Sequence, residues 1–207
     1  IKRTLQKVHG TNKVRILGKQ KQVIYVEVST RRLAALGVSP QVIFNAIADG
    51  PATVERILDS EDVRSTAACL SALGVEIDWP TGAPVAHIRG NGMHSLFEAD
   101  DTLDCGNSGT SMRLLLGLLA GHPILSILTG DASLRSRPMA RVIGPLRSMG
   151  AQISARKGDT LAPVVVRGGS LRAIDYESPM ASAQVKSAIM LAGLYANGPS
   201  SVIEPDK

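Results

Sequence analysis

Leu103–Gly121, with the sequence LDCGNSGTSMRLLLGLLAG, joins a polar turn directly to an apolar run. The glycines of the turn allow positive φ, and its Asn, Ser and Thr side chains can cap free backbone N–H groups. Leu and Met then follow almost without interruption and without proline, which predicts a buried helix. The start of such a helix presents unpaired N–H groups and a positive dipole end, so the turn is a candidate site for phosphate or carboxylate. A capped core helix without a ligand is the alternative.

Two sequence patterns repeat on either side of this segment. Ala-x-Gly-Pro follows a predicted helix and precedes a strand at Ala48–Pro51 and Ala196–Pro199, with a looser copy at Ala120–Pro123. Leu-x-x-(Leu/Met)-Gly closes a helix before a strand at Leu70–Gly74 and Leu146–Gly150. The repeats predict an α/β fold built from three helix, strand, helix, strand, strand units whose apolar faces pack together.

Composition and charge narrow the class of protein. The 207 residues are 44% hydrophobic, which is enough to bury a sizeable core. No run of about 18 apolar residues and no apolar leader is present, so we expect a cytoplasmic protein that does not enter the membrane. Nine of the 23 Lys and Arg residues but one of the 18 acidic residues lie in residues 1–32, and aromatic residues make up 3%. A basic leading segment and few aromatic rings do not indicate nucleic-acid binding.

Two further helix starts carry groups suited to an anion. Pro138 suits the first position of a helix, which predicts Arg137 at the cap with its guanidinium beside the helix dipole. Ser182 is a candidate cap for the apolar helix predicted over Val185–Tyr195. A solvated arginine and an ordinary serine cap are the alternatives. The cysteines and histidines lack metal-ligand spacing, so we expect no metal and no cofactor.

The same residues carry a family resemblance. The segments are GNSGTSMR at 106–113, LTGDASLRSRPM at 128–139, SPMASAQVKSAIMLAGLYANGPSSVIEP at 178–205 and LDSEDVRSTAACLSALGV at 58–75. Together they resemble the N-terminal-half globule of the 5-enolpyruvylshikimate-3-phosphate (EPSP) synthases, also called 3-phosphoshikimate 1-carboxyvinyltransferases. The resemblance implies repeated βαβαββ units with helices packed inside, here one globule of the enolpyruvyl transferase fold. It also implies transfer of the enolpyruvyl group from phosphoenolpyruvate to the 5-hydroxyl of shikimate 3-phosphate, a step of aromatic amino acid biosynthesis.

The resemblance implies specific site residues. Gly109 is expected to offer its backbone to phosphoenolpyruvate, Arg137 to hold its phosphate, and Gln184 to contact both substrates. Ser182 and Ala183 are expected to contact shikimate 3-phosphate. The residues expected to shape the turn are Asn107, Thr110 and Arg113. We assign no residue of this sequence to catalytic proton transfer.

Three departures from the family pattern bear on activity. A Lys-Ser pair expected before Ala48 is missing, and Lys13–Ile47 resembles instead a strand and helix of the porter domain of resistance-nodulation-division efflux pumps. We therefore expect an atypical leading segment at 1–47 and the transferase-like globule at 48–207, with the first unit altered and the third truncated at Lys207. Leu114 stands where many relatives have proline, which predicts altered sensitivity to the inhibitor glyphosate.

Other functions stay open beside enolpyruvyl transfer. One is a non-catalytic half-site that binds shikimate 3-phosphate, or a folded remnant that needs a complementing second globule. Another is the sister transferase acting on UDP-N-acetylglucosamine, although that family usually has a reactive cysteine in the loop that here reads Asp131–Arg137. The expected partners are small phosphorylated substrates and a complementing second-globule chain.

Overall fold

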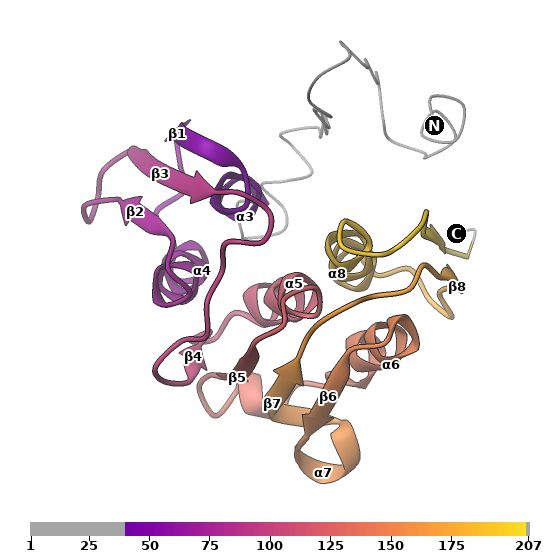
Figure 1. The fold of residues 1–207 in the computed structure, drawn as a ribbon. Coiled ribbons are helices and arrows are strands. Elements are labelled where there is room, and N and C mark those ends of the chain that lie inside the picture. Colours follow the sequence, from indigo (N-terminus) through magenta and orange to yellow (C-terminus); the bar gives the residue numbers. More distant parts are fainter. Residues whose placement is uncertain (1–39, 206–207) are drawn as a thin grey trace, which may run out of the picture. The chain divides into compact units, whose positions relative to one another are not determined.

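The computed structural model describes residues 40–205 of the 207-residue chain (Figure 1). Every element described below lies in the compact unit that covers residues 38–207. The part of the pump-like segment before residue 40 lies outside the described residues. The described part of that segment contains one helix, α3 (Pro40–Ala46). The boundary predicted at 47/48 stays a prediction.

The first repeat unit forms a three-stranded antiparallel sheet with two helices. The strands pair in the order β1-β3-β2. Ser60 caps the second helix, because its hydroxyl accepts from the Val63 N–H at 3.4 Å. The elements are α3 (Pro40–Ala46), β1 (Asp49–Glu55), α4 (Glu61–Ala72), β2 (Glu76–Asp78) and β3 (Val85–Asn91).

The second unit is complete and follows the same plan. Its sheet has the order β4-β5-β7-β6, in which β4 and β5 are parallel and the other pairs antiparallel. Gly150 ends the helix α6 with φ +112°, a left-handed conformation that favours glycine. The elements are β4 (Leu103–Asp104), α5 (Gly109–Leu119), β5 (Leu125–Thr129), the 3₁₀ turn η1 (Leu134–Ser136), α6 (Ala140–Met149), β6 (Gln152–Ala155), α7 (Arg156–Asp159) and β7 (Leu161–Arg167).

The third unit is described up to its second strand. β8 (Asp175–Glu177) and β9 (Ser201–Ile203) are parallel neighbours joined through α8 (Ala183–Gly193), as β4 and β5 are joined through α5. The order β1-β3-β2 likewise matches β5-β7-β6. The predicted three-fold repetition of an α/β unit is therefore confirmed in strand order and direction.

An Arg-Gly pair occurs at the ends of two equivalent strands, at 89–90 and 167–168, and the structure shows why its second residue is glycine. A Cβ on Gly90 would lie 2.3 Å from the carbonyl oxygen of Asn45, at the end of α3. A Cβ on Gly168 would lie 2.1 Å from the carbonyl oxygen of Leu119, at the end of α5. In both units the strand backbone thus lies directly against the last turn of the first helix, where no side chain fits.

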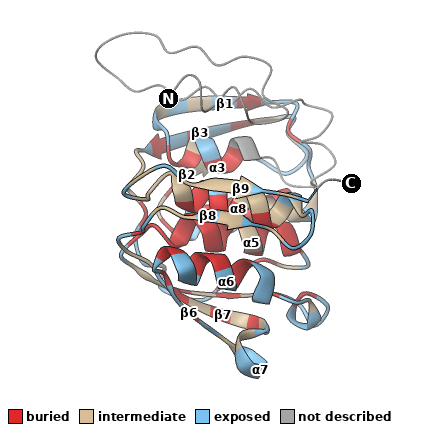
Figure 2. Ribbon diagram, turned by 90° about the vertical axis from the view of Figure 1, so that its right-hand side faces the viewer, coloured by how far each residue is buried: buried red, intermediate tan, exposed pale blue. Residues whose placement is uncertain are grey.

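The helices form the interior of the globule. Every residue of α5 except Arg113 is buried, and α5 contacts α4, α6 and α8. Buried residues gather on α5, α6 and α8, while the outer strands carry exposed positions (Figure 2). The prediction of helices packed inside is confirmed. In the part of the chain that the structure describes, none of the helices combines the length and apolar composition that crossing a bilayer requires.

Candidate anion-binding site

The turn before α5 has the predicted capped geometry. Ser108 is the N-cap, and its hydroxyl accepts from the Ser111 N–H at 3.1 Å. Gly106 has φ +56° and its N–H donates to the Asp104 carboxylate at 2.8 Å. These bonds fix the backbone around Gly109, which is the first residue of α5. The capping bond uses the Ser111 N–H, whereas the N–H groups of Gly109 and Thr110, at the first two positions, have no partner inside the helix and can meet a ligand.

A buried chain of hydroxyl groups ties this turn to the first repeat unit. The Ser111 hydroxyl donates to the Ser108 hydroxyl at 2.7 Å and also lies 2.7 Å from the Thr66 hydroxyl. Thr66 Oγ1 also lies 2.9 Å from the Asp62 carbonyl oxygen, within α4, and its one proton serves either that oxygen or the Ser111 hydroxyl. Satisfied buried hydroxyls of this kind rigidify a site, because breaking any one bond leaves a buried polar group unpaired.

Two arginine side chains crowd Gly109. A Cβ at this position would lie 2.7 Å from Arg113 Nη1 and 3.3 Å from Arg137 Nη1, so a side chain here would displace both guanidinium groups. Arg113 donates from Nη1 to the Gly109 carbonyl oxygen at 3.1 Å and from Nη2 to the Pro138 carbonyl oxygen at 2.9 Å. The cations are therefore held beside the positive end of α5.

Gln184 joins this group from the start of α8. Its Oε1 accepts from Arg113 Nη1 at 2.7 Å, and its Nε2 donates to the Thr110 hydroxyl at 2.7 Å. Both ends of the amide are thus fixed by α5. The structure brings together Gly109, Thr110, Arg113, Arg137 and Gln184, which the sequence predicted to share one site.

Arg137 reaches the site by a different route from the one predicted. Its backbone is extended (φ −79°, ψ 139°) between η1 and α6, and α6 begins at Ala140. The prediction that Pro138 opens a helix with Arg137 at its cap is wrong. The Met139 N–H bonds to the Thr160 carbonyl oxygen at 2.8 Å and the Pro138 carbonyl oxygen accepts from Arg113, and these contacts hold the segment out of a helix until Ala140. Arg137 Nη2 donates to Asn107 Oδ1 at 2.5 Å, so its guanidinium lies against the α5 turn.

Neither arginine of the site, Arg113 or Arg137, is in direct ion-pair contact with a carboxylate of the described residues. Burial lowers the pKa of Arg113, and the nearby positive charges of Arg137 and Arg141 lower it further. An arginine stays protonated despite such a shift, so the group gains by binding an anion that relieves the repulsion.

Ser182 and Ala183 lie at the border of this cluster. The Ser182 hydroxyl accepts from the Val185 N–H at 3.4 Å, which confirms the predicted cap of α8. The Ser182 N–H donates to Glu204 Oε1 at 2.9 Å, and Glu204 Oε2 also pairs with Lys186 Nζ at 2.5 Å. Ala183 is exposed. Neither residue bonds to Gly109 or Arg137 within the described residues, so they reach the site only through their neighbour Gln184.

Sequence reasoning missed three residues that organise the site. Asp131 accepts from Asn107 Nδ2 at 2.6 Å, Glu204 and Lys186 hold the start of α8, and each acts across 18 or more residues of sequence. Asp131 lies in the segment LTGDASLRSRPM, but no local sequence pattern indicates which distant residue its side chain contacts. No group of three or more His, Cys, Asp or Glu side chains is placed to hold a metal ion anywhere in 40–205.

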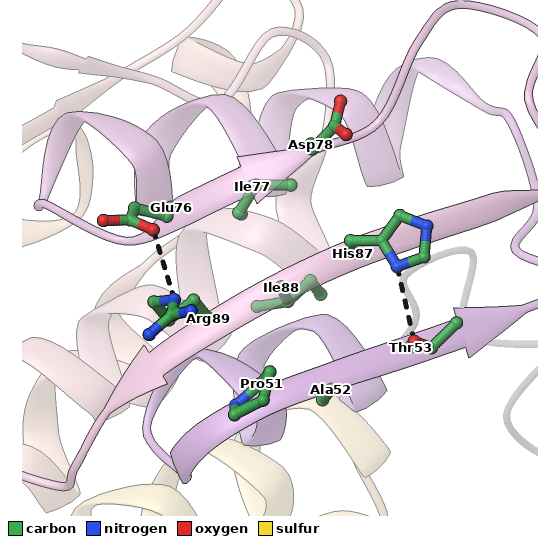
Figure 3. A pocket seen from close by; sticks show the side chains of 9 residues that line it. All are labelled: Pro51, Ala52, Thr53, Glu76, Ile77, Asp78, His87, Ile88 and Arg89. Carbon is green, nitrogen blue, oxygen red and sulfur yellow. Dashed lines mark hydrogen bonds and ion pairs between the residues drawn. The ribbon is translucent and has the colours of Figure 1, made fainter.

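A hollow separate from the α5 turn lies on the outer face of the β1-β3-β2 sheet (Figure 3). It encloses about 530 Å³ and is lined by Pro51, Ala52, Thr53, Glu76, Ile77, Asp78, His87, Ile88 and Arg89. Its Arg89 pairs with Glu76 at 3.4 Å, and its His87 lies 3.3 Å from the Thr53 hydroxyl. The positive charge of Arg89 is already paired with the Glu76 carboxylate, whereas the arginines beside α5 have no such ion pair among residues 40–205. The α5 turn is therefore the better candidate site for a phosphorylated ligand.

Known proteins are similar to this chain over most of its length. The sequence model of the family described as "EPSP synthase (3-phosphoshikimate 1-carboxyvinyltransferase)" matches residues 32–206. The 3-phosphoshikimate 1-carboxyvinyltransferase of Pelobacter propionicus is 56% identical over 164 residues, 79% of this chain and 38% of that protein. That of Gloeobacter violaceus is 57% identical over 161 residues, 77% of this chain and 37% of the relative.

A solved structure is similar over the same region. EPSP synthase from Acinetobacter baumannii superposes with a TM-score of 0.78 and 47% identity, covering 81% of this chain and 38% of that one. The chain therefore spans less than two fifths of the length of the relatives it matches. The resemblance of Lys13–Ile47 to an efflux pump is not addressed by these relatives and stays a prediction.

Proposed function

This chain belongs to the EPSP synthase family, and we propose that its residues 40–205 form the part of an active site that binds phosphoenolpyruvate and shikimate 3-phosphate for enolpyruvyl transfer. In the proposed reaction the 5-hydroxyl of shikimate 3-phosphate adds to C2 of phosphoenolpyruvate, and phosphate leaves. The remaining groups of the site would come from a second globule, in the same protein or on a complementing chain. The proposed setting is the cytoplasm.

The single observation that carries this proposal is the pair of guanidinium groups beside Gly109, neither of which is in direct ion-pair contact with a carboxylate in the described region. A phosphate dianion fits such a pair, because a planar guanidinium can give two parallel hydrogen bonds to phosphate oxygens. The Gly109 N–H, at the first position of α5, adds a backbone donor in the same place. We assign the phosphate of phosphoenolpyruvate to Arg137 and this helix start.

Gln184 suits a role between the two substrates. Its amide is oriented by Arg113 and Thr110, so its position is set before a ligand arrives. Each of its polar atoms has capacity for a second hydrogen bond, since the amide oxygen has two lone pairs and the amide nitrogen two N–H groups. Gln184 is therefore proposed to contact both substrates, while Asn107, Thr110 and Arg113 hold the turn in place.

The start of α8 suits shikimate 3-phosphate. The Ser182 hydroxyl accepts the capping bond from the Val185 N–H, which leaves its own O–H free to donate. Glu204 occupies the Ser182 N–H and keeps the turn in position. We assign Ser182 and the exposed Ala183 to shikimate 3-phosphate, with the Ser182 O–H as the donor to the ligand.

Phosphate release tests the proposed reaction. The full 207-residue chain is mixed with a second-globule fragment of a relative and with both substrates, and phosphate is measured over time. We expect release above the rate of either part alone, and a reduction of about 10–100-fold in Arg137→Ala, the order expected for losing hydrogen bonds to a charged group. Arg89→Ala is the matched control, because Arg89 lies exposed on the outer face of the β1-β3-β2 sheet and, within residues 40–205, forms an ion pair with Glu76 alone.

Binding without turnover would support the half-site alternative. If the mixture releases no phosphate while shikimate 3-phosphate binds the chain in calorimetry, the chain is a binding module.

If Leu114→Pro changes inhibition by glyphosate, the proposed effect of this departure from the family pattern on inhibitor discrimination is supported. Leu114 is buried directly after Arg113 in α5, so a change there acts on the turn through the helix backbone.

A further inference from the structure

Asp131 stands where the two loops of the phosphate site meet. Its Oδ2 accepts from Asn107 Nδ2 at 2.6 Å, and its Oδ1 accepts from the Leu134 N–H at 2.7 Å. Its own N–H donates to the Gly106 carbonyl oxygen at 2.9 Å. One residue therefore bonds both to the turn before α5 and to the loop that leads to Arg137.

A relay of side chains continues from Asp131 to the arginine. Asn107 donates its amide nitrogen to Asp131 and accepts Arg137 Nη2 on its amide oxygen at 2.5 Å. We propose that Asp131 is a positioning residue that acts through Asn107 to hold the Arg137 guanidinium ready for the phosphate of phosphoenolpyruvate. This inference rests on the proposed function for the identity of the ligand, but the relay itself is a property of the free protein.

The polarity of the relay follows from hydrogen-bond chemistry. An ionised carboxylate only accepts, so it selects the orientation in which the Asn107 amide nitrogen faces Asp131. The amide oxygen is then left facing Arg137, which only donates. With the amide turned by 180°, Asn107 would present its N–H groups to Arg137 and its oxygen to the carboxylate, and both contacts would be lost.

The carboxylate keeps this role over a wide pH range. The bond from Asn107 lowers the pKa of Asp131, and the Leu134 N–H and the charge of Arg137 lower it further. Asp131 thus stays ionised at any pH at which the substrates are doubly charged phosphates.

A positioning role and a purely electrostatic role predict opposite changes in phosphoenolpyruvate affinity for Asp131→Asn. Removing a negative charge beside the site makes it more positive, which on charge alone would tighten the binding of an anion. An asparagine at this position has one accepting oxygen in place of two, and the Leu134 N–H, a fixed backbone donor, takes it. Its amide N–H groups then face the Asn107 amide nitrogen, so the relay is lost, the Arg137 guanidinium is freed, and binding carries an added ordering cost. The inference therefore predicts weaker binding although the variant gains positive charge.

The experiment uses the ¹⁵N-labelled full chain in solution NMR. The first readout, without ligand, is the Arg137 guanidinium signal, identified by its absence in Arg137→Ala. The second is titration with phosphoenolpyruvate followed at the Gly109 amide. Asp159→Asn is the matched control, because Asp159 also accepts a backbone N–H, from Ala155 at 2.7 Å, and an arginine, Arg147 at 2.7 Å, outside the site.

We expect Asp131→Asn to bring the Arg137 guanidinium into fast exchange and to weaken phosphoenolpyruvate binding about tenfold, the order for a lost charge-assisted bond. Asn107→Ala should reproduce both effects, and Asp159→Asn neither. In the Arg137→Ala background, Asp131→Asn should cause no further loss of affinity, since the two act as one unit.

An unchanged guanidinium signal in Asp131→Asn overturns the inference, and so does equal or tighter binding. If the unsubstituted chain fails to bind phosphoenolpyruvate, the proposed function falls, and the guanidinium signal alone then decides the role of Asp131. If Asp131→Asn does not fold, the same decision is made with Asn107→Ala, which removes the relay and leaves the Leu134 N–H bond in place.

Discussion

Arg113 of α5 donates a 2.7 Å hydrogen bond to Gln184 of α8, 71 residues further along the chain. The bond joins the first helices of two successive repeat units at their N-terminal ends. Because equivalent helices start at equivalent places in a repeat, their positive dipole ends meet in one region. The candidate site is thus a product of the repetition, and the arginines add the positive charge that the proposed phosphate ligand requires.

Arg113→Lys tests whether this bond positions Gln184 for both substrates. Lysine keeps the charge but cannot reach the Gly109, Pro138 and Gln184 oxygens with one rigid fork. We expect the dissociation constants of phosphoenolpyruvate and shikimate 3-phosphate each to rise about tenfold, measured by calorimetry. Arg172→Lys is the control, because Arg172 donates to the Ser148 carbonyl oxygen at 2.6 Å on an exposed surface. A loss confined to phosphoenolpyruvate would contradict the role given to Gln184.

Gly117→Ala tests the packing that brings α5 and α8 together. A Cβ on Gly117 would lie 2.2 Å from the Ala188 carbonyl oxygen, and backbone cannot yield as a flexible side chain does. We expect the free energy of unfolding in urea to fall by about 2 kcal/mol. Gly144→Ala is the control in α6, where an added Cβ meets nothing within 4 Å, and a gain of up to about 1 kcal/mol is expected there. Equal effects of the two substitutions would show that the helices are not in contact at Gly117.

His122 makes stability depend on pH. Its ring is 1% exposed, and Nδ1 lies 3.0 Å from the Leu118 carbonyl oxygen. Burial lowers the pKa of His122 below its ordinary 6.5, and the rings of His94 and Tyr195 face it. The unfolded chain then binds the proton more readily than the native one, so His122 costs no stability above pH 6.5 and destabilises the fold increasingly below it.

The measurement is the free energy of unfolding between pH 7.5 and pH 5, about the ordinary histidine pKa. His122→Gln should flatten the loss of stability in this window. The lowered pKa values of Asp131 and Asp159 act in a separate window, where stability is lost as pH falls below about 3.8. An identical pH profile for His122→Gln and the unsubstituted chain would contradict this account.

The elements that the sequence predicts well are those set by neighbouring residues. Ser108 and the leucine run define α5, and the helix-closing glycines at 74 and 150 mark two units that share one strand order. The expectation that proline opens a helix was wrong at Pro138, because contacts from Arg113 and Thr160 hold the segment out of a helix. Asp131 and Glu204 could not be assigned, because their partners are set by tertiary packing and not by spacing.

The central claim is that Arg137 and the start of α5 bind the phosphate of phosphoenolpyruvate. Calorimetric titration of the full chain with phosphoenolpyruvate, in the presence of shikimate 3-phosphate, tests it most directly. We predict binding that weakens about 10–100-fold in Arg137→Ala and is unchanged in Arg89→Ala. Equal affinity of the unsubstituted chain and Arg137→Ala would contradict the claim.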